Sequence, residues 1–331
     1  MDRFASAFTL FMSLLVEAFP FLLIGVLFSS ALLFLINERR LVQIMPKNPL
    51  LGAITGSLFG FLFPACECGN VPVARRLLMQ GVPSPVAIGF LLAAPTVNPI
   101  VIWATWTAFR DQPEIVVLRV VCSLVIAITL ACLFSVQPDL QALVQPAIAN
   151  ALPQANPSPL NLLQGGTFML GGGSTRFETA AYQAALSLEP PLPRANLDRL
   201  RMFLDNTFQE LRDLGGVLVL GSAIAASIQV FVPRELILNL GQDAVTSVVA
   251  MMVLAGVVSI CSTVDSFFAL SFAGTFTSGA LLAFLVYGPM IDLKAVGMLL
   301  SVFKPRTLFY LFLLITQLTF LMALVVNLNW S

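Results

Sequence analysis

Eight long stretches without a charged residue constrain this chain more than any other feature. Each contains about 18 residues or more, the length that a helix needs to cross a hydrocarbon core of roughly 30 Å. A soluble core accounts for one or two such stretches, whereas eight predict an all-α polytopic membrane protein. They are rich in Leu, Ile, Val and Phe without period-2 alternation, which favours helices over a β-barrel. The stretches are Ala18–Asn37, Asn48–Cys66, Leu77–Phe109, Val120–Pro138, Leu214–Pro233, Ala244–Val264, Ser266–Ile291 and Thr307–Ser331.

The composition supports this interpretation. Charged residues make up only 10% of the 331 residues, against roughly 25% in soluble domains. Asp2-Arg3 before an apolar stretch resembles the start of a signal peptide, but Glu17 interrupts the stretch and no small-residue cleavage site follows. We therefore predict an uncleaved first helix and an integral protein of the cell (inner or plasma) membrane.

The sequence lacks the residues that several classes of enzyme require. The chain has no histidine, and none of its three lysines, Lys47, Lys294 and Lys304, follows a glycine. Histidine-based catalysis and a Walker A loop are therefore excluded, and we expect no enzyme activity, no catalytic residue and no cofactor. The net charge of zero gives no indication of a nucleic-acid partner. The expected partners are a small-molecule or ion substrate and the lipid bilayer. Association with further copies of the same chain, as a homo-oligomer, is an open alternative.

A proline- and glycine-rich segment divides the chain. Residues 138–207 contain eight prolines and the run Gly171-Gly172-Gly173. We interpret this segment as a cytoplasmic linker between a first transmembrane repeat, residues 1–137, and a second, residues 208–331.

The two halves resemble each other weakly at their unusual residues, which suggests an internal duplication. Duplicated halves with paired helix breaks are typical of secondary transporters, whose binding site lies where the broken helices meet. The matching pairs, at offsets of 194 to 196, are Glu17 and Asp213, Gly25 and Gly221, Cys66 and Cys261, Asn70 and Asp265, and Asn98 and Asp292.

Charge placement favours an inverted arrangement of the halves. Three crossings and one re-entrant hairpin in each half, with hairpin tips at Cys66–Asn70 and Cys261–Asp265, would make the two repeats pseudo-symmetric and inverted. Twelve Lys and Arg residues would then lie in the cytoplasm, as the positive-inside rule requires. Eight conventional helices with parallel halves are the alternative. Under the inverted arrangement the residues expected outside are Arg3, Arg110, Arg119 and Arg234.

The string Cys66-Glu67-Cys68-Gly69-Asn70 places two thiols, a carboxylate and an amide at a helix break. Irregular backbone at membrane depth occurs where it is buried in protein or lines a cavity. Cys66 and Cys68 would suit a thiophilic metal or metalloid. The alternative is that small Cys and Gly residues permit tight packing, with Glu67 reaching the interface.

Four further polar residues are candidates for the substrate site. Asn70, Asn98, Asp265 and Asp292 would converge if the hairpin tips met the broken helices. A buried carboxylate is costly in a membrane and usually persists for function, so Asp265 and Asp292 are candidate proton carriers. Alternatively, Asp265 caps a helix and Asp292 lies in a loop. Glu17 and Asp213, within the opening helices of the halves, are candidates for coupling or gating, against a role in helix packing.

The string with Pro64 before it and Pro72 after it resembles the predicted permease family that includes organoarsenical efflux permeases. Gly81-Val82-Pro83 and Pro95-Thr96-Val97-Asn98-Pro99 match two further family motifs. The resemblance covers most of both membrane halves and implies a multi-helix transporter with the cysteine motif near the transport path. Glu67 stands where serine is common, so the resemblance implies a permease without naming its solute.

We therefore expect a permease that works by alternating access, driven by an ion gradient, with protons as the expected ion. The site would comprise Cys66, Glu67, Cys68, Asn70, Thr96, Asn98, Asp265 and Asp292. One alternative is a membrane thiol-redox enzyme that uses Cys66 and Cys68, in which both thiols would be essential. Another is a passive channel, which would show ohmic currents in place of saturable flux.

Overall fold

Helices make up nearly all the regular structure in the described part of the chain. The computed structural model describes residues 2–35, 45–46, 48–63, 67–135, 143–146, 195–231 and 244–330. Within these residues the exception is an isolated antiparallel bridge between Val144 and Phe303. The helices are α1 (Asp2–Leu35), α3 (Pro49–Leu62), α4 (Glu67–Met79), α5 (Ser84–Val97), α6 (Pro99–Ala108), α7 (Pro113–Ser135), α11 (Ala195–Phe231), α13 (Ala244–Val258), α14 (Asp265–Leu270), α15 (Ser278–Met290), α16 (Leu293–Leu299) and α17 (Pro305–Trp330).

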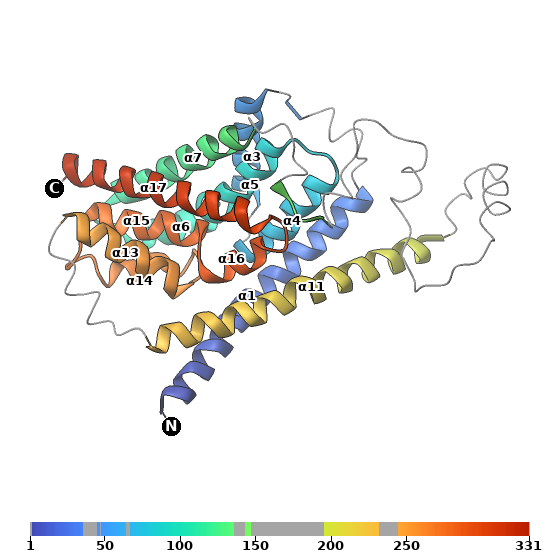
Figure 1. The fold of residues 1–331 in the computed structure, drawn as a ribbon, viewed down its shortest axis with the longest axis horizontal. Coiled ribbons are helices and arrows are strands. Elements are labelled where there is room, and N and C mark those ends of the chain that lie inside the picture. The colour runs from blue at the N-terminus through green and yellow to red at the C-terminus, as the bar shows by residue number, and fades with distance from the viewer. Residues whose placement is uncertain are drawn as a thin grey trace.

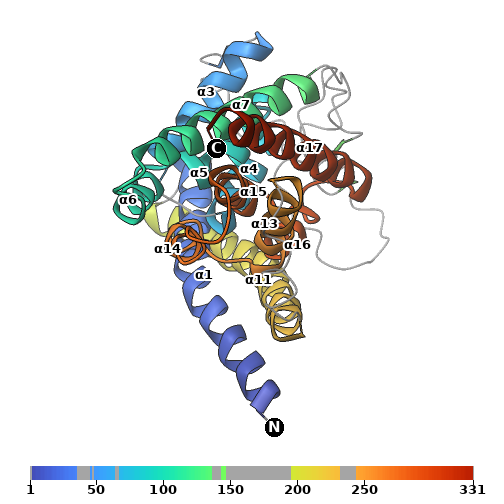
Figure 2. The same cartoon turned by 90° about the vertical axis from the view of Figure 1, so that its left-hand side faces the viewer.

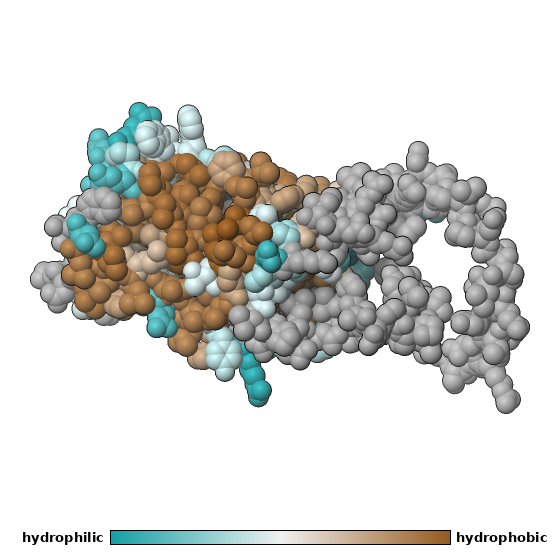
Figure 3. All heavy atoms as spheres, turned by 90° about the horizontal axis from the view of Figure 1, so that it is seen from above, coloured by the Kyte–Doolittle hydropathy of each residue, from teal (hydrophilic) through white to brown (hydrophobic). Residues whose placement is uncertain are grey.

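The helices confirm the predicted polytopic membrane protein. Five helical segments of the described chain are long and apolar enough to cross a bilayer. Large apolar side chains also cover the outside, as expected for a surface that faces lipid; Leu62 is 73% exposed and Trp103 72% exposed. In Figure 3 brown, apolar atoms dominate the coloured part of the visible face, with teal atoms mainly at its edges. The five segments are Ala5–Ala31, Ser84–Ala108, Pro113–Ser135, Ser278–Leu299 and Pro305–Asn329.

Two of these segments are interrupted where the sequence predicted it. Asn98 separates α5 from α6, and Ile291 and Asp292 separate α15 from α16. Pro99 follows the first break, where a proline fits because the first turn of a helix leaves its N–H groups unbonded anyway. Each break therefore produces a short second half-helix that begins inside an apolar segment.

The long helices α1 and α11 form an antiparallel pair. Ser30, near the end of α1, hydrogen-bonds Thr207, near the start of α11, with 3.0 Å between their hydroxyl oxygens. Leu14 packs with Ala225 and Ala226 toward the other end of the pair. The two helices lie diagonally beside the remaining helices (Figures 1 and 2).

The remaining long helices pack in the same order in both parts of the chain. α3 lies along α5, which packs on α7, while α13 lies along α15, which packs on α17. Gly56 and Gly60 of α3 let its backbone approach α5 so closely that a Cβ atom at Gly56 would overlap the Val86 backbone. Small residues at such crossings are typical of packing between membrane helices.

The described residues do not test the predicted division into domains. Most of residues 138–207 lie outside them, and α11 begins at Ala195. The boundaries of the two repeats and of the linker stay a prediction.

Candidate functional site

The two helix breaks carry equivalent polar caps. The Asn98 side chain accepts a hydrogen bond from Val101 N at 2.9 Å and donates one to Ala94 O at 3.2 Å. Asp292 Oδ1 accepts from Ala295 N at 2.5 Å at the start of α16. Both caps are buried. Each side chain therefore satisfies backbone groups that the break leaves without a helical partner.

Asp265, at the start of α14, is paired with a buried arginine. Arg119 Nη2 lies 2.8 Å from Asp265 Oδ2, and Nη1 lies 3.2 Å from Oδ1, so the carboxylate is held at both oxygens. Arg119 belongs to α7 and is only 1% exposed. A bidentate contact of this kind is stronger and more directional than a single charge contact.

The Arg119 guanidinium also donates hydrogen bonds to two hydroxyl groups. Arg119 Nη1 donates to Thr105 Oγ1 and Ser266 Oγ, both at 2.8 Å, and Thr105 and Ser266 lie 3.0 Å apart. These contacts join α6 and α7 to α14. Arg119, which was expected outside with Arg110, is buried within the protein and paired with Asp265, and the side of the membrane on which it lies stays a prediction.

A second buried charged group lies where α4 meets α16. Lys294 Nζ is 3.9 Å from Glu67 Oε1 and 4.0 Å from Asp292 Oδ2. Lys294 and Asp292 are 2% exposed and Glu67 is 6% exposed. The burial of Glu67 excludes the alternative in which it reaches the membrane interface. We call Glu67, Asp292 and Lys294 the lysine cluster.

The other predicted site residues lie at several places. Cys68 and Asn70, on α4, are fully buried, as is Thr96, which donates to Ala93 O at 3.0 Å within α5. Cys68 and Cys261 lie close enough to Glu67 to interact with its charge. Thiols from both halves therefore lie near the lysine cluster. Cys66 lies outside the described residues.

No described group of three or more His, Cys, Asp and Glu side chains is placed to hold a metal ion. Because Cys66 lies outside the described residues, this finding leaves the proposed Cys66–Cys68 pair untested.

The two candidate coupling residues have different surroundings. Glu17 on α1 is half-buried and is an electrostatic neighbour of Lys294. Asp213 on α11 is exposed and lies near Glu210 instead. Glu17 is therefore associated with the lysine cluster, whereas Asp213 is not.

Two glycines place α1 and α11 against this region. A Cβ atom on Gly25 of α1 would overlap the Gly69 backbone of α4, and one on Gly221 of α11 would lie 3.4 Å from Lys294 Cα. These glycines are one of the pairs matched between the halves. The helix pair therefore packs directly on the segments that carry Glu67 and Lys294.

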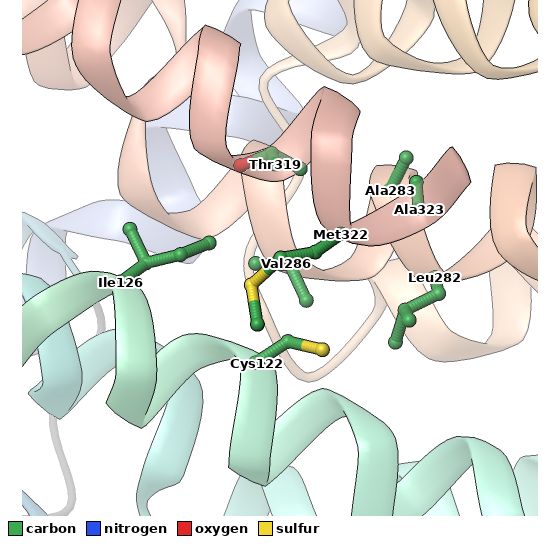
Figure 4. Close-up of a pocket in the computed structure, with 8 residues that line it drawn as sticks. All are labelled: Cys122, Ile126, Leu282, Ala283, Val286, Thr319, Met322 and Ala323. Carbon is green, nitrogen blue, oxygen red and sulfur yellow. The ribbon is translucent and has the colours of Figure 1, made fainter. Parts of the chain in front are cut away.

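One crevice among the described residues lies away from both charged groups. It is lined by Thr319 and by apolar side chains of α7, α15 and α17, including Cys122 and Met322, and leaves no room for a water molecule (Figure 4). Cys122 lies here among mainly apolar neighbours as a small core residue.

Sequence reasoning missed Arg119 and Lys294 as members of the site. The sequence predicted Arg119 only as a residue on the outside and assigned Lys294 no role in the site. The signal available was their position: Arg119 lies between Leu118 and Val120 within an apolar run, and Lys294 follows Asp292 by two residues at a break. A charge embedded in this way usually faces a partner inside the protein.

Comparison with known proteins is consistent with this architecture. The family described as predicted permease matches residues 3–328. The chain is 36% identical over 308 residues to the UPF0718 protein YcgR of Bacillus subtilis (strain 168), covering 93% of this chain and 91% of that one.

A second relative comes from Streptococcus mutans serotype c and is named as a candidate two-component membrane permease complex subunit. It is 31% identical over 297 residues, covering 90% of this chain and 87% of the relative. No solved structure matches the chain. The family match and both identities extend over nearly the whole length, so the chain belongs to the predicted permease family.

Proposed function

We propose that this permease is a secondary transporter, and not an enzyme, that moves a small solute by alternating access between its two halves. The observation that carries the proposal is a pair of cross-contacts. α4 of the first half packs on α16 of the second, and α14 of the second half packs on α6 of the first. Both contacts hold buried charged groups. Charges inside a membrane protein usually mark a transport path.

An inverted repeat would explain this exchange of partners. α3, α4, α5, α6 and α7 would correspond to α13, α14, α15, α16 and α17, and the antiparallel α1 and α11 would form the remaining pair. An axis that exchanges the halves would then exchange the α4–α16 contact with the α6–α14 contact. Inverted repeats related in this way are a recurrent architecture of secondary transporters.

The position of α1 and α11 would then represent one of two alternative states. α1 packs on α4 and α11 packs on α16, so the helix pair covers the α4–α16 contact. In the opposite state, the pair would cover the α6–α14 contact instead. Rocking of one unit against the others about a central site is the usual form of alternating access.

The substrate site would lie beside these contacts, with Cys66, Glu67, Cys68, Asn70, Thr96, Asn98, Asp265 and Asp292 as its candidate residues. Cys68 and Cys261 approach Glu67 from different halves. Thiols from two moving units would suit a thiophilic metal or a metalloid such as arsenic, which prefers soft ligands.

The test is a toxicity and accumulation screen with arsenicals, antimonials, zinc and copper in cells with and without the gene. We expect one solute to change in accumulation, with saturable flux in proteoliposomes. Cys68→Ser should shift its apparent affinity, whereas Cys122→Ser should not, because Cys122 lies in the separate apolar crevice. Ohmic currents would indicate a channel, and complete loss with either single Cys→Ser change at 66 or 68 would favour the redox enzyme.

A further inference from the structure

With both of its carboxyl groups ionised, the lysine cluster would contain one more negative charge than positive charge. Glu67 and Asp292 contribute two carboxylates, and Lys294 contributes one ammonium. Among the described residues, the other groups that interact with the charges of Glu67 and Lys294 include Glu17, Cys68 and Cys261, which are not cations. An unbalanced charge at a buried position is unfavourable unless something compensates it.

The distances show that Lys294 is in hydrogen-bond contact with neither carboxylate. Charge-assisted N–H···O bonds are about 2.7–2.9 Å long, whereas Nζ lies 3.9 Å from Glu67 Oε1 and 4.0 Å from Asp292 Oδ2. Glu67 Oε2 and Asp292 Oδ2 are buried and accept no hydrogen bond. The cluster therefore has two carboxylate oxygens, from opposite halves, that are available to one more positive group.

The other buried ion pair provides the contrast. Arg119 and Asp265 balance in charge and make two direct hydrogen bonds, supported by Thr105 and Ser266. Within that pair, Arg119 Nε is buried without a hydrogen-bond partner, whereas both Asp265 oxygens accept hydrogen bonds from the guanidinium. The two contacts between the halves therefore differ: the charged groups of one make direct hydrogen bonds to each other, and those of the other do not.

The surroundings of Asp292 supply further hard oxygen atoms. Ser259, directly after α13, adopts a left-handed φ of 47°, and its hydroxyl accepts from Leu293 N at 3.1 Å. The carboxyl end of α13 therefore lies beside the start of α16. Helix carboxyl ends carry partial negative charge, and broken-helix ends commonly coordinate Na⁺ in transporters.

We propose that the lysine cluster binds one small inorganic cation, Na⁺ in the first instance, between Glu67 Oε2 and Asp292 Oδ2. Because these oxygens come from α4 and α16, the bound cation would draw the two halves together at this contact. Its role as the coupling ion rests on the transport function proposed above, whereas its binding can be measured without any solute.

The experiment measures thermal unfolding of the purified full-length protein in detergent, with NaCl replaced by choline chloride at constant ionic strength and pH. We expect a saturable rise of about 5 °C in Tm at Na⁺ concentrations near 100 times Kd. Glu67→Gln and Asp292→Asn should abolish the Na⁺ response. Asn retains the ability to cap α16, so Asp292→Asn is expected to fold. Glu114→Gln, at an exposed carboxylate on α7, is the matched control and should retain the response.

The choline baseline separates a cation site from a structural ion pair. If the excess charge is real, Glu67→Gln should raise Tm in choline, because it removes the uncompensated carboxylate. A fall in Tm would instead mean that Glu67 and Lys294 form an ordinary structural pair, and would overturn the proposal. An equal Tm in Na⁺ and choline would overturn it too, including the case in which Tm follows pH alone and a proton compensates the charge.

These outcomes can be distinguished from failure of the proposed function. A protein that transports a solute without any response to Na⁺ would retain the transport function and lose this site. A protein that binds Na⁺ at Glu67 and Asp292 but moves no solute would retain this site and lose the transport function.

Discussion

Arg119 and Asp265 form a buried ion pair, 2.8 Å apart, that joins α7 of the first half to α14 of the second. The contact spans 146 residues of sequence and is bidentate. In the lysine cluster at the α4–α16 contact, the charged side chains make no direct hydrogen bond to one another. We infer that the two contacts between the halves have different roles. The Arg119–Asp265 pair holds the halves together, and the lysine cluster responds to a ligand.

Removing the arginine should destabilise the protein strongly. Arg119→Met leaves the Asp265 carboxylate buried without a cation, and such a change costs about 3–5 kcal/mol of unfolding free energy. The double variant Arg119→Met with Asp265→Asn removes both charges and should recover most of this loss. Thermal unfolding in detergent checks both. A double variant as unstable as the single one would show that the ion pair is not the cause.

Close helix packing makes Gly56 intolerant of a methyl group. A Cβ atom there would come within 2.8 Å of Val86 Cα in a backbone contact that cannot rotate away. Gly56→Ala should therefore lower stability by about 1–3 kcal/mol, as overpacking does. Gly216→Ala on α11 is the control, since nothing lies within 4 Å of its Cβ position. An equal effect of both substitutions, measured by thermal unfolding, would contradict this account of the α3–α5 contact.

The inverted arrangement predicts opposite sides for two loops. Arg110→Cys, at an exposed position between α6 and α7, should react with a membrane-impermeant maleimide from outside intact cells. Lys304→Cys, just before α17, should react only after the cells are permeabilised. Labelling of both positions from the same side would exclude the inverted arrangement.

A disulfide between α1 and α11 should arrest the transport cycle. The hydroxyl oxygens of Ser30 and Thr207 lie 3.0 Å apart, so Ser30→Cys with Thr207→Cys places two thiols close together. If the ends of the two helices separate during alternating access, oxidation should abolish flux in proteoliposomes and reduction should restore it. Each single substitution under the same oxidation is the control. Unchanged flux in the oxidised pair would mean that these ends stay together throughout the cycle.

Much of the local structure was predictable because it depends on local rules. Long uncharged runs predict membrane helices, since a charge in the hydrocarbon core is costly. The prolines and polar residues around Asn98 and Asp292 predicted the two interruptions, because proline removes a backbone donor and disfavours a helical residue before it. Asp292 illustrates the limit of this reasoning: it was recognised as important, but its cap on α16 and its approach to Lys294 were not anticipated.

The sequence by itself determined that this protein lies in a membrane, that it is helical, and where its helices break. These properties depend on hydrophobicity and backbone chemistry, which act over neighbouring residues. Only the tertiary structure decided which buried charges meet. Arg119 reaches Asp265, and Lys294 lies between Glu67 and Asp292, because α14 packs on α6 and α4 packs on α16 across the two halves. These pairings depend on helix contacts distant in sequence, and no local pattern specifies the partner of a charge.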